Sequence, residues 1–161
     1  MLVNPHGHSE LKPLLAAEDE RADLLIEAKA FTCVPMTSRE LSDLLMLGMG
    51  AYTPLEGFMG EESWKKCCTD FTLANGCFWP IPITLSASEE IASGISIGET
   101  VALTDENGEI YGTLNVIEKY TIDKELECQE IYKTSDPKHP GVEKVMAQNP
   151  VNLAGSVTVL N

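Results

Sequence analysis

The stretch Thr100–Lys119, TVALTDENGEIYGTLNVIEK, decides the expected fold, because it has the pattern of two β-strands joined by a tight turn. Val, Ile, Thr and Tyr, which favour strands, are frequent in Thr100–Thr104 and in Ile110–Lys119. Between them, Asn107-Gly108 predicts a hairpin with a type I′ turn, because both residues tolerate positive φ angles. Two further strands are expected, at Ile81–Leu85 and Ser156–Leu160. The second half of the chain therefore predicts a mostly antiparallel sheet.

Helical patterns are concentrated in the first half of the chain. Thr37 can cap a helix while Glu40, three residues on, reaches back to form a capping box, and Gly48 or Gly50 could end that helix. Apolar residues at three- and four-residue spacing predict the others. These are Glu18–Ala30, with acids in its first turn; Glu61–Thr69, with Trp64, Cys67 and Cys68 near one face; and the later segments Asp123–Tyr132 and Gly141–Gln148.

Helices followed by a mostly antiparallel sheet, with helical excursions, predict an α+β fold. The chain shows no internal repeat, low-complexity tract or long linker, so one domain spanning residues 1–161 is expected. Within it we expect an extended arm at residues 1–16, a mainly helical part at 17–70 and mainly strands at 77–161.

The charge balance excludes several classes of partner. There are 25 acidic and 11 basic side chains among 161 residues, a formal charge of −14, which repels nucleic acid and anionic membranes. Only Arg21 and Arg39 could offer a bidentate guanidinium, so the chain is poorly equipped to hold sulfate or a triphosphate by itself. No uncharged stretch reaches the ~20 mostly apolar residues of a membrane span.

Cysteine usage and the N-terminus indicate a cytoplasmic location. The five cysteines are odd in number and fit no regular framework, so we expect reduced thiols and no disulfides. Met1–His6 has neither a basic region nor an apolar core, so no secretory signal is expected.

Few residues offer independent chemistry. His6-Gly7-His8 could contribute zinc ligands, but no C-x-x-C or H-x-x-x-H partner exists, and an exposed polar arm is the simpler interpretation. Cys67 and Cys68 are expected to pack as small apolar groups. A nucleophilic cysteine would need His139, the only histidine outside the arm, and the glycines lack the spacing of a phosphate loop. The residues alone therefore predict no catalytic, cofactor-binding or metal site.

Several short sequence motifs instead constrain the path of the backbone. Gly50–Met59, GAYTPLEGFM, joins a helix end to a proline-fixed bend and an aromatic anchor. Trp79–Ile83, WPIPI, places two prolines at a strand start, which restricts it to an edge or entry position. His139–Val142, HPGV, is typical of a rigid corner before a helix. Each string is best explained as fixing the shape of the backbone.

Taken together, these strings resemble the N-terminal domain of the ATP sulfurylase (sulfate adenylyltransferase) family along nearly the whole chain. Pro5-His6-Gly7 with Leu11 resembles the family's P-H-G-G-x-L, and Gly50–Met59 resembles G-x-x-S-P-L-x-G-F-M. Three further matches are Trp79–Ile83 with W-P-I-P-I, Tyr120 with Asp123-Lys124 and Y-x-x-D-K, and Asp136–Val142 with D-x-x-H-P-G-V. His8 replaces the second glycine of the opening motif, and Thr53 replaces a serine while keeping its hydroxyl.

The resemblance implies a PUA-like pseudo-barrel with flanking helices, followed in the family by a nucleotidyltransferase domain that binds ATP and sulfate. The family's Q-x-R-N-x-x-H and G-R-D-H motifs belong to that second domain and do not occur here, so no catalytic residue is carried over. The implied reaction of the full-length enzyme, in sulfate assimilation, is ATP plus sulfate giving adenosine 5′-phosphosulfate and pyrophosphate, with Mg²⁺.

This chain is accordingly expected to be a non-catalytic scaffold that supports its own C-terminal catalytic domain and a homo-oligomer. Pro54–Met59 and His139–Val142 are the expected interface corners. The alternatives are a stand-alone PUA-like module that binds RNA, against which the acidic balance argues, and a zinc-dependent or thiol enzyme.

Overall fold

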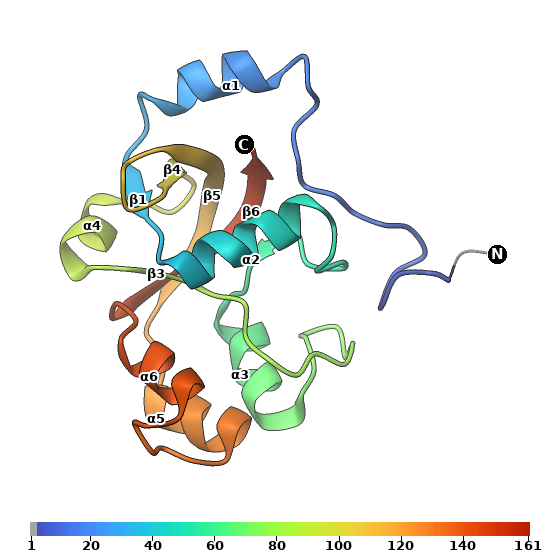
Figure 1. Ribbon diagram of the computed structural model, residues 1–161, viewed down its shortest axis with the longest axis vertical. Helices are drawn as coiled ribbons and strands as arrows, with labels where there is room; N and C mark the ends of the chain where they lie inside the picture. The colour runs from blue at the N-terminus through green and yellow to red at the C-terminus, as the bar shows by residue number, and fades with distance from the viewer. Residues whose placement is uncertain (1–2) are drawn as a thin grey trace.

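The computed structural model describes residues 3–161 as one curved sheet with helices around it (Figure 1). The sheet has the order β1-β4-β5-β6-β2, and β3 also pairs with β6. Every pairing is antiparallel except that of β1 with β4. The strands are β1 Cys33–Pro35, β2 Gly57–Phe58, β3 Leu85–Ala87, β4 Thr100–Thr104, β5 Ile110–Tyr120 and β6 Val151–Val159. The α+β, mostly antiparallel fold class is confirmed.

The β4–β5 hairpin is confirmed, but its turn is not of type I′. Only Gly108 has a positive φ, of 83°, and Asn107 does not. The Asp105 carboxylate accepts the Asn107 N–H at 2.9 Å and the Glu109 N–H at 2.8 Å. These two hydrogen bonds to Asp105 stabilise a turn in which only Gly108 needs a left-handed backbone conformation.

Strand boundaries differ from the prediction where prolines or long-range pairing decide them. The expected strand at Ile81–Leu85 is wrong for most of its length, because β3 begins only at Leu85. Pro80 and Pro82 cannot donate to a ladder, so β3 begins only after them. The expected strand at Ser156–Leu160 starts five residues earlier, at Val151, because β6 pairs with β5, β2 and β3 along its length.

Three helices occupy the first half of the described chain. They are α1 Arg21–Ala28, shorter at both ends than expected; α2 Ser38–Gly48; and α3 Glu61–Asp70. The capping box of α2 is confirmed: Thr37 Oγ1 accepts the Glu40 N–H, and Glu40 Oε2 accepts the Thr37 N–H at 2.8 Å.

The second half of the chain has helices that interrupt the strands. They are α4 Glu89–Gly94, α5 Lys124–Glu127, which runs into the π-helix η1 Cys128–Tyr132, and α6 Pro140–Met146. Periodicity did not predict α4, whose six residues are too few to show it. The helical segments expected around Asp123–Tyr132 and Gly141–Gln148 are confirmed with shifted ends.

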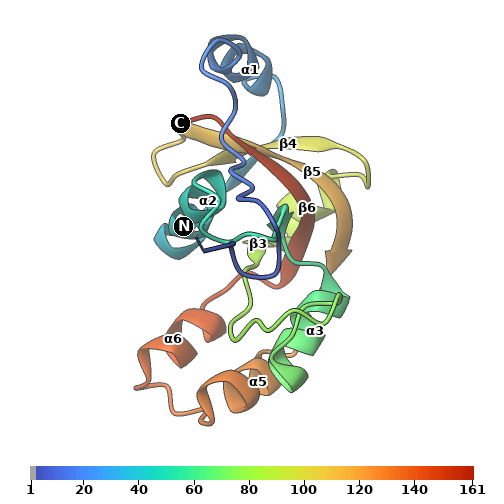
Figure 2. The same ribbon diagram turned by 90° about the vertical axis from the view of Figure 1, so that its right-hand side faces the viewer.

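The largest apolar core lies between the sheet and α2, and a smaller lobe of α3, α5, η1 and α6 lies at one end of the molecule (Figure 2). Trp64, Cys68 and Tyr120 form the apolar contact between this lobe and the sheet. Residues 14–16 also pair with the end of β6, where Ala16 N–H donates to Val159 O at 2.8 Å.

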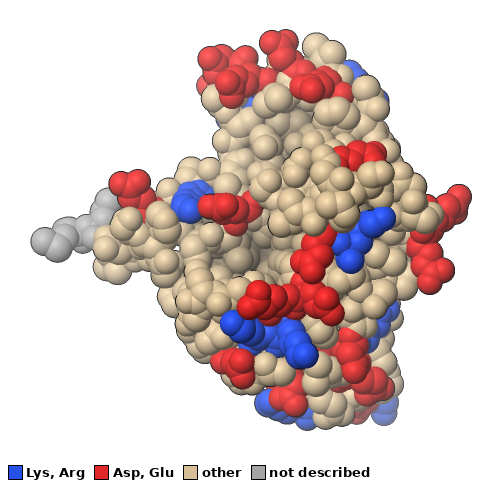
Figure 3. Space-filling view, turned by 180° about the vertical axis from the view of Figure 1, so that it is seen from behind, with Lys and Arg blue, Asp and Glu red and all other residues tan. Residues whose placement is uncertain are grey.

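Acidic groups are spread over the surface seen in Figure 3 and gather over α1, while basic groups are few and scattered among them. No helix within residues 3–161 combines the length and apolarity needed to cross a membrane.

Candidate functional site

The N-terminal arm, the corner after α2 and the loop before β3 meet in one place, although they are far apart in the sequence. His6 Nε2 lies 2.7 Å from the Phe78 carbonyl oxygen, and the His6 ring centroid lies 6.4 Å from that of Trp79. The Tyr52 ring meets Trp79 edge-on at 5.9 Å. Three of the five family-like motifs therefore form a single assembly, which we call the motif cluster: residues 5–7, 50–54 and 77–83.

Backbone geometry explains why the motif cluster needs its particular residues. Thr53 Oγ1 donates to Gly50 O at 2.7 Å and accepts the Lys12 N–H at 3.0 Å, so one hydroxyl ties the arm to the corner. Gly50 has φ +75°, and a Cβ there would lie 2.9 Å from the Pro13 nitrogen. The hydroxyl that serine and threonine share makes both contacts, which explains why Thr53 is an adequate replacement.

Beside the motif cluster lies an apolar groove of about 380 Å³. It is lined by His6, Tyr52, Phe78, Trp79, Pro80, Ile81 and Ile83. Phe78 is 58% exposed and Ile81 42% exposed. Within the described residues the buried Trp79 Nε1–H has no hydrogen-bond partner. Large apolar side chains gathered at a groove are typical of a surface that another protein element covers.

The two expected interface corners behave differently. Phe58 and Met59 are each 3% exposed and belong to the main core, so within the expected corner at Pro54–Met59 these two side chains are not available to an interface. The side chains of Phe58, in β2, and of Met59, directly after it, instead pack into the main core. His139 caps α6, accepting the Gly141 N–H at 3.1 Å, and its ring centroid lies 5.0 Å from that of Tyr132, with the two rings tilted by 42°. The structure does not bring His139 into the motif cluster.

Tyr120, Asp123 and Lys124 have structural roles. Tyr120 Oη donates to Met59 O at 2.7 Å, which links β5 to the residue after β2. The Asp123 carboxylate accepts the Leu126 N–H at 2.9 Å and caps α5. Lys124 Nζ donates to Met146 O at 3.2 Å, at the end of α6. This motif therefore joins the small lobe to the sheet and contributes no reactive group.

The residues proposed for metal or thiol chemistry lie apart. His8 Nδ1 is engaged locally with Glu10, and the described residues contain no cluster of three His, Cys, Asp or Glu side chains suited to a metal. Cys67 and Cys68 are fully buried, as their expected packing role requires. Burial raises the pKa of Cys67 to about 12, with the nearby Glu127 charge adding to the effect, so the thiolate needed for nucleophilic attack is suppressed.

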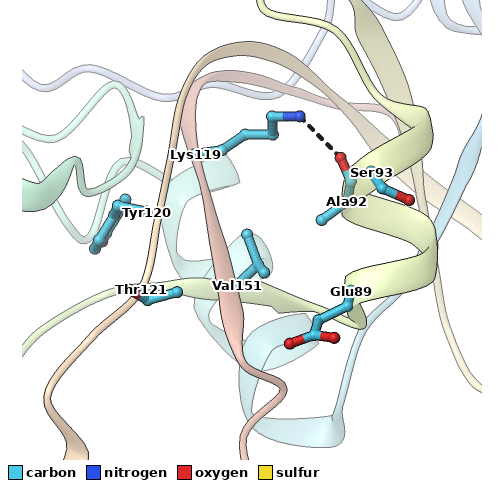
Figure 4. A pocket seen from close by; sticks show the side chains of 7 residues that line it. All are labelled: Glu89, Ala92, Ser93, Lys119, Tyr120, Thr121 and Val151. Carbon is cyan, nitrogen blue, oxygen red and sulfur yellow. Dashed lines mark hydrogen bonds between the residues drawn. The ribbon is translucent and has the colours of Figure 1, made fainter.

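A second hollow, of about 440 Å³, lies between α4 and the ends of β5 and β6. Its one amine, Lys119 Nζ, donates to Ala92 O at 2.9 Å (Figure 4) and also to Ile95 O at 2.7 Å. Lys119 therefore caps the carbonyl end of α4. These bonds use the only cation among the residues that line the hollow, which leaves the carboxylate of Glu89 as its other charged group.

The curved, mostly antiparallel sheet with its flanking helices defines the class of protein. Residues 3–161 match the PUA-like domain family, and the chain belongs to that family. Its curated relatives are sulfate adenylyltransferases: the chain is 57% identical over 163 residues to the one from Syntrophobacter fumaroxidans and 55% identical over 162 residues to the one from Chlorobaculum tepidum. Both matches cover 99% of this chain but only 40% of the relative.

A solved structure supports the same classification. A hexameric APS kinase from Thiobacillus denitrificans superimposes with a TM-score of 0.73 at 26% identity. The match covers 99% of this chain and 27% of that one. The family match and the partial coverage of the curated relatives confirm the sequence resemblance to the sulfate adenylyltransferase N-terminal domain, and a stand-alone PUA-like module is not favoured.

The sequence did not reveal the groove or Tyr52 and Phe78 as parts of it. Single exposed aromatic residues carry no local pattern, and 72 residues separate Phe78 from His6. The available indication was the aromatic and proline content of Trp79–Ile83, which we interpreted only as a backbone device.

Proposed function

We propose that this chain is the non-catalytic N-terminal domain of a cytoplasmic sulfate adenylyltransferase of sulfate assimilation. The full protein would convert ATP and sulfate to adenosine 5′-phosphosulfate and pyrophosphate. The observation that carries the proposal is 57% identity over 99% of this chain to a sulfate adenylyltransferase of which it spans only 40%. The five free thiols of the chain are consistent with a reducing compartment.

The charges of this domain support placing the chemistry in the rest of the protein. Adenylyl transfer needs concentrated positive charge around the phosphates. Here the chain carries −14 in total and has only two arginines, so its charge opposes the binding of a triphosphate. No step of the reaction is therefore assigned to residues of this chain.

The apolar groove supports the scaffold role. Covering Phe78 and Ile81 would remove large apolar side chains from water, which stabilises a docked element by about 25 cal/mol per Å² of buried apolar area. The covering element in this proposal is the catalytic domain of the same protein. The printed description of the Thiobacillus denitrificans neighbour as hexameric is consistent with a homo-oligomer for the full protein.

The activity is tested by measuring pyrophosphate release with ATP, Mg²⁺ and sulfate for this chain and for the longer gene product that contains it. We expect turnover only from the longer product. Turnover by the 161-residue chain alone would overturn the non-catalytic role, and sulfate-independent release by the longer product would overturn the assigned reaction.

The docking role has a separate test in the same two proteins. The double variant Phe78→Asp, Ile81→Asp should lower the melting temperature of the longer product while leaving that of the isolated chain nearly unchanged. Ile97→Asp is the matched control, because Ile97 is also 58% exposed but does not line the groove. Equal losses in both proteins would show that the groove residues act only within this domain.

A further inference from the structure

The two tryptophans of the chain differ in how their indole N–H groups are satisfied. Both side chains are buried, with Trp64 4% exposed and Trp79 8% exposed. Trp64 Nε1–H donates to Glu127 Oε2 at 2.7 Å, whereas the buried Trp79 Nε1–H has no hydrogen-bond partner within residues 3–161. A buried indole usually finds a partner, because an unpaired, desolvated donor is costly. The Trp79 N–H therefore indicates a contact that the described residues do not supply.

Trp79 is held in a fixed position by its neighbours. Its backbone N–H donates to Phe71 O at 2.7 Å, and its carbonyl oxygen accepts the Cys67 thiol at 3.1 Å. The Tyr52 ring packs edge-on against the indole, and Tyr52 Oη donates to Asp43 Oδ1 at 3.0 Å. The indole is thus oriented before any partner arrives. A preorganised donor loses little conformational freedom when it is paired, which favours binding.

Trp79 is one of the residues that line the apolar groove beside the motif cluster. Phe78 and Ile81, the exposed side chains of this groove, lie on either side of Trp79 and Pro80 in the sequence. Tryptophan surrounded by apolar side chains is typical of the centre of a protein–protein contact, where a few residues contribute most of the binding energy. The groove therefore offers both an apolar surface and one unused hydrogen-bond donor.

The lining of the groove restricts the chemistry of the group that can pair with this donor. No Lys, Arg, Asp or Glu is among the lining residues. A carboxylate acceptor would have to leave water without a neighbouring Lys or Arg to pair with it, which is costly. A neutral carbonyl oxygen, of a backbone peptide or of an Asn or Gln side chain, loses less on desolvation and still accepts the indole N–H.

The length of the relatives indicates which part of the protein carries that carbonyl. This chain spans 40% of the Syntrophobacter fumaroxidans sulfate adenylyltransferase, so most of that relative lies outside the matched domain. We propose that Trp79 is the polar anchor of the contact with the catalytic domain. An element of that domain places a carbonyl oxygen on Trp79 Nε1–H and an apolar side chain against Phe78 and Ile81. This inference rests on the proposed function and adds the chemistry of the contact.

Docking in this way requires a small local rearrangement. Because Trp79 Nε1 is buried in the isolated domain, neighbouring side chains have to move aside before a carbonyl oxygen can reach it. Phe78 is 58% exposed, and such side chains commonly change rotamer when an interface forms while the backbone moves little. The fixed backbone contacts of Trp79 are consistent with a change confined to side chains.

The direct test is ¹⁵N NMR of the tryptophan indole groups in this chain and in the longer gene product that contains it. Trp64→Phe and Trp79→Phe assign the two indole signals. The Trp64 signal should be the same in both proteins, because its acceptor, Glu127, belongs to this chain. The Trp79 signal should move downfield in the longer product, the direction that a new hydrogen bond gives. An unmoved Trp79 signal would overturn the proposal.

The same two variants give a second measurement. Trp79→Phe keeps an aromatic ring but removes the donor, so it should lower the melting temperature of the longer product by about 2–4 °C more than that of the isolated chain. Trp64→Phe is the matched control, because it removes a hydrogen bond within this domain and should lower both melting temperatures equally. Equal losses for Trp79→Phe in the two proteins would contradict an anchor in the catalytic domain.

Two further readouts separate this inference from its alternatives. A Trp79 signal that moves when the isolated chain is diluted would assign the groove to a second copy of this chain and overturn the proposal. Sulfate-dependent pyrophosphate release by a longer product whose Trp79 signal has not moved would leave the proposed function standing and reject the anchor alone. A longer product without that activity would reject the proposed function, whatever the indole signal shows.

Discussion

At the scale of single residues, two fully buried glutamates show how differently a carboxylate is accommodated. Glu40 accepts four hydrogen bonds, from the N–H groups and hydroxyls of Thr37 and Ser86. Glu127 is also 1% exposed, but within residues 3–161 its carboxylate accepts a single hydrogen bond, from Trp64 Nε1–H at 2.7 Å. Burial raises the pKa of Glu127, and the Trp64 bond and the charges of Arg39 and Lys124 only partly oppose it.

The raised pKa of Glu127 predicts a pH-dependent stability. The folded protein holds this proton more tightly than the unfolded chain, so the free energy of unfolding falls as pH rises from the ordinary pKa to the raised one. Glu127→Gln, which keeps an acceptor for Trp64, should flatten this fall when urea unfolding is followed from acid to neutral pH. Asp43, whose pKa burial also raises, contributes a slope of the same sign, while Glu56 and Asp105, whose pKa values are lowered by hydrogen bonds from Lys12 and Asn107, contribute slopes of the opposite sign.

Glu62→Gln is the matched control for that measurement. The Glu62 side chain is 74% exposed and pairs only with Lys66, at 3.3 Å. The free energy of unfolding of Glu62→Gln should therefore show the same pH dependence as that of the parent chain. If Glu127→Gln kept the full pH dependence of the free energy of unfolding, the charged form of Glu127 would not destabilise the folded protein.

At the scale of elements, β6 organises the fold because it pairs with β5, β2 and β3. The close approach of these strands depends on two glycines. A Cβ at Gly155 would overlap the Asn115 carbonyl of β5, and a Cβ at Gly57 would overlap the Gly155 carbonyl. Opposite Gly155, the register of β5 shifts between Val116 and Glu118, which is the irregularity of a β-bulge.

Gly155→Ala should therefore destabilise the domain by about 1–3 kcal/mol, because the added methyl group has to displace backbone. Gly94→Ala is the matched control, since a Cβ at that position meets no atom within 4 Å. It should leave stability unchanged or raise it by up to about 1 kcal/mol, by restricting the unfolded chain. Chemical denaturation of both variants gives the comparison, and similar stabilities would show that β6 shifts without strain.

At the scale of the whole molecule, the charge of −14 repels itself in the compact state. Only four ion pairs join residues of the described chain, and three of them lie at the surface: Lys12–Glu56, Lys66–Glu62 and Lys133–Glu130. The fold is therefore held together by its apolar core and backbone pairing, with surface electrostatics opposing compaction.

Sodium chloride should consequently raise the melting temperature of this chain as the Debye length shortens toward about 8 Å at physiological ionic strength. Neutralising the acidic run Glu18, Asp19 and Glu20, all exposed, to the corresponding amides should raise the melting temperature at low salt and reduce the response to salt. Scanning calorimetry over a salt series measures both. An undiminished response in the amide variant would indicate that this run contributes little to the repulsion.

Local chemistry explains which elements could be predicted from the sequence. The Thr37 to Glu40 capping box and the prolines of Trp79–Ile83 act through neighbouring residues, although the effect of the prolines on the strand boundary was underestimated. The strands β1 and β2, of three and two residues, were missed because each is defined by its partner strand. Asn107-Gly108 correctly located the hairpin, but the Asp105 carboxylate decided its geometry.

By itself the sequence determined the fold class, the starts of several helices, the acidic balance and, through its ordered motifs, the resemblance to one family. These features depend on residue chemistry and on spacings of a few positions. The tertiary structure alone decided that His6 meets Phe78 beside an apolar groove, and that Trp64 Nε1–H meets Glu127 while Trp79 Nε1–H meets no acceptor within residues 3–161. Those meetings depend on strand pairing and core packing between segments tens of residues apart, which no local pattern encodes.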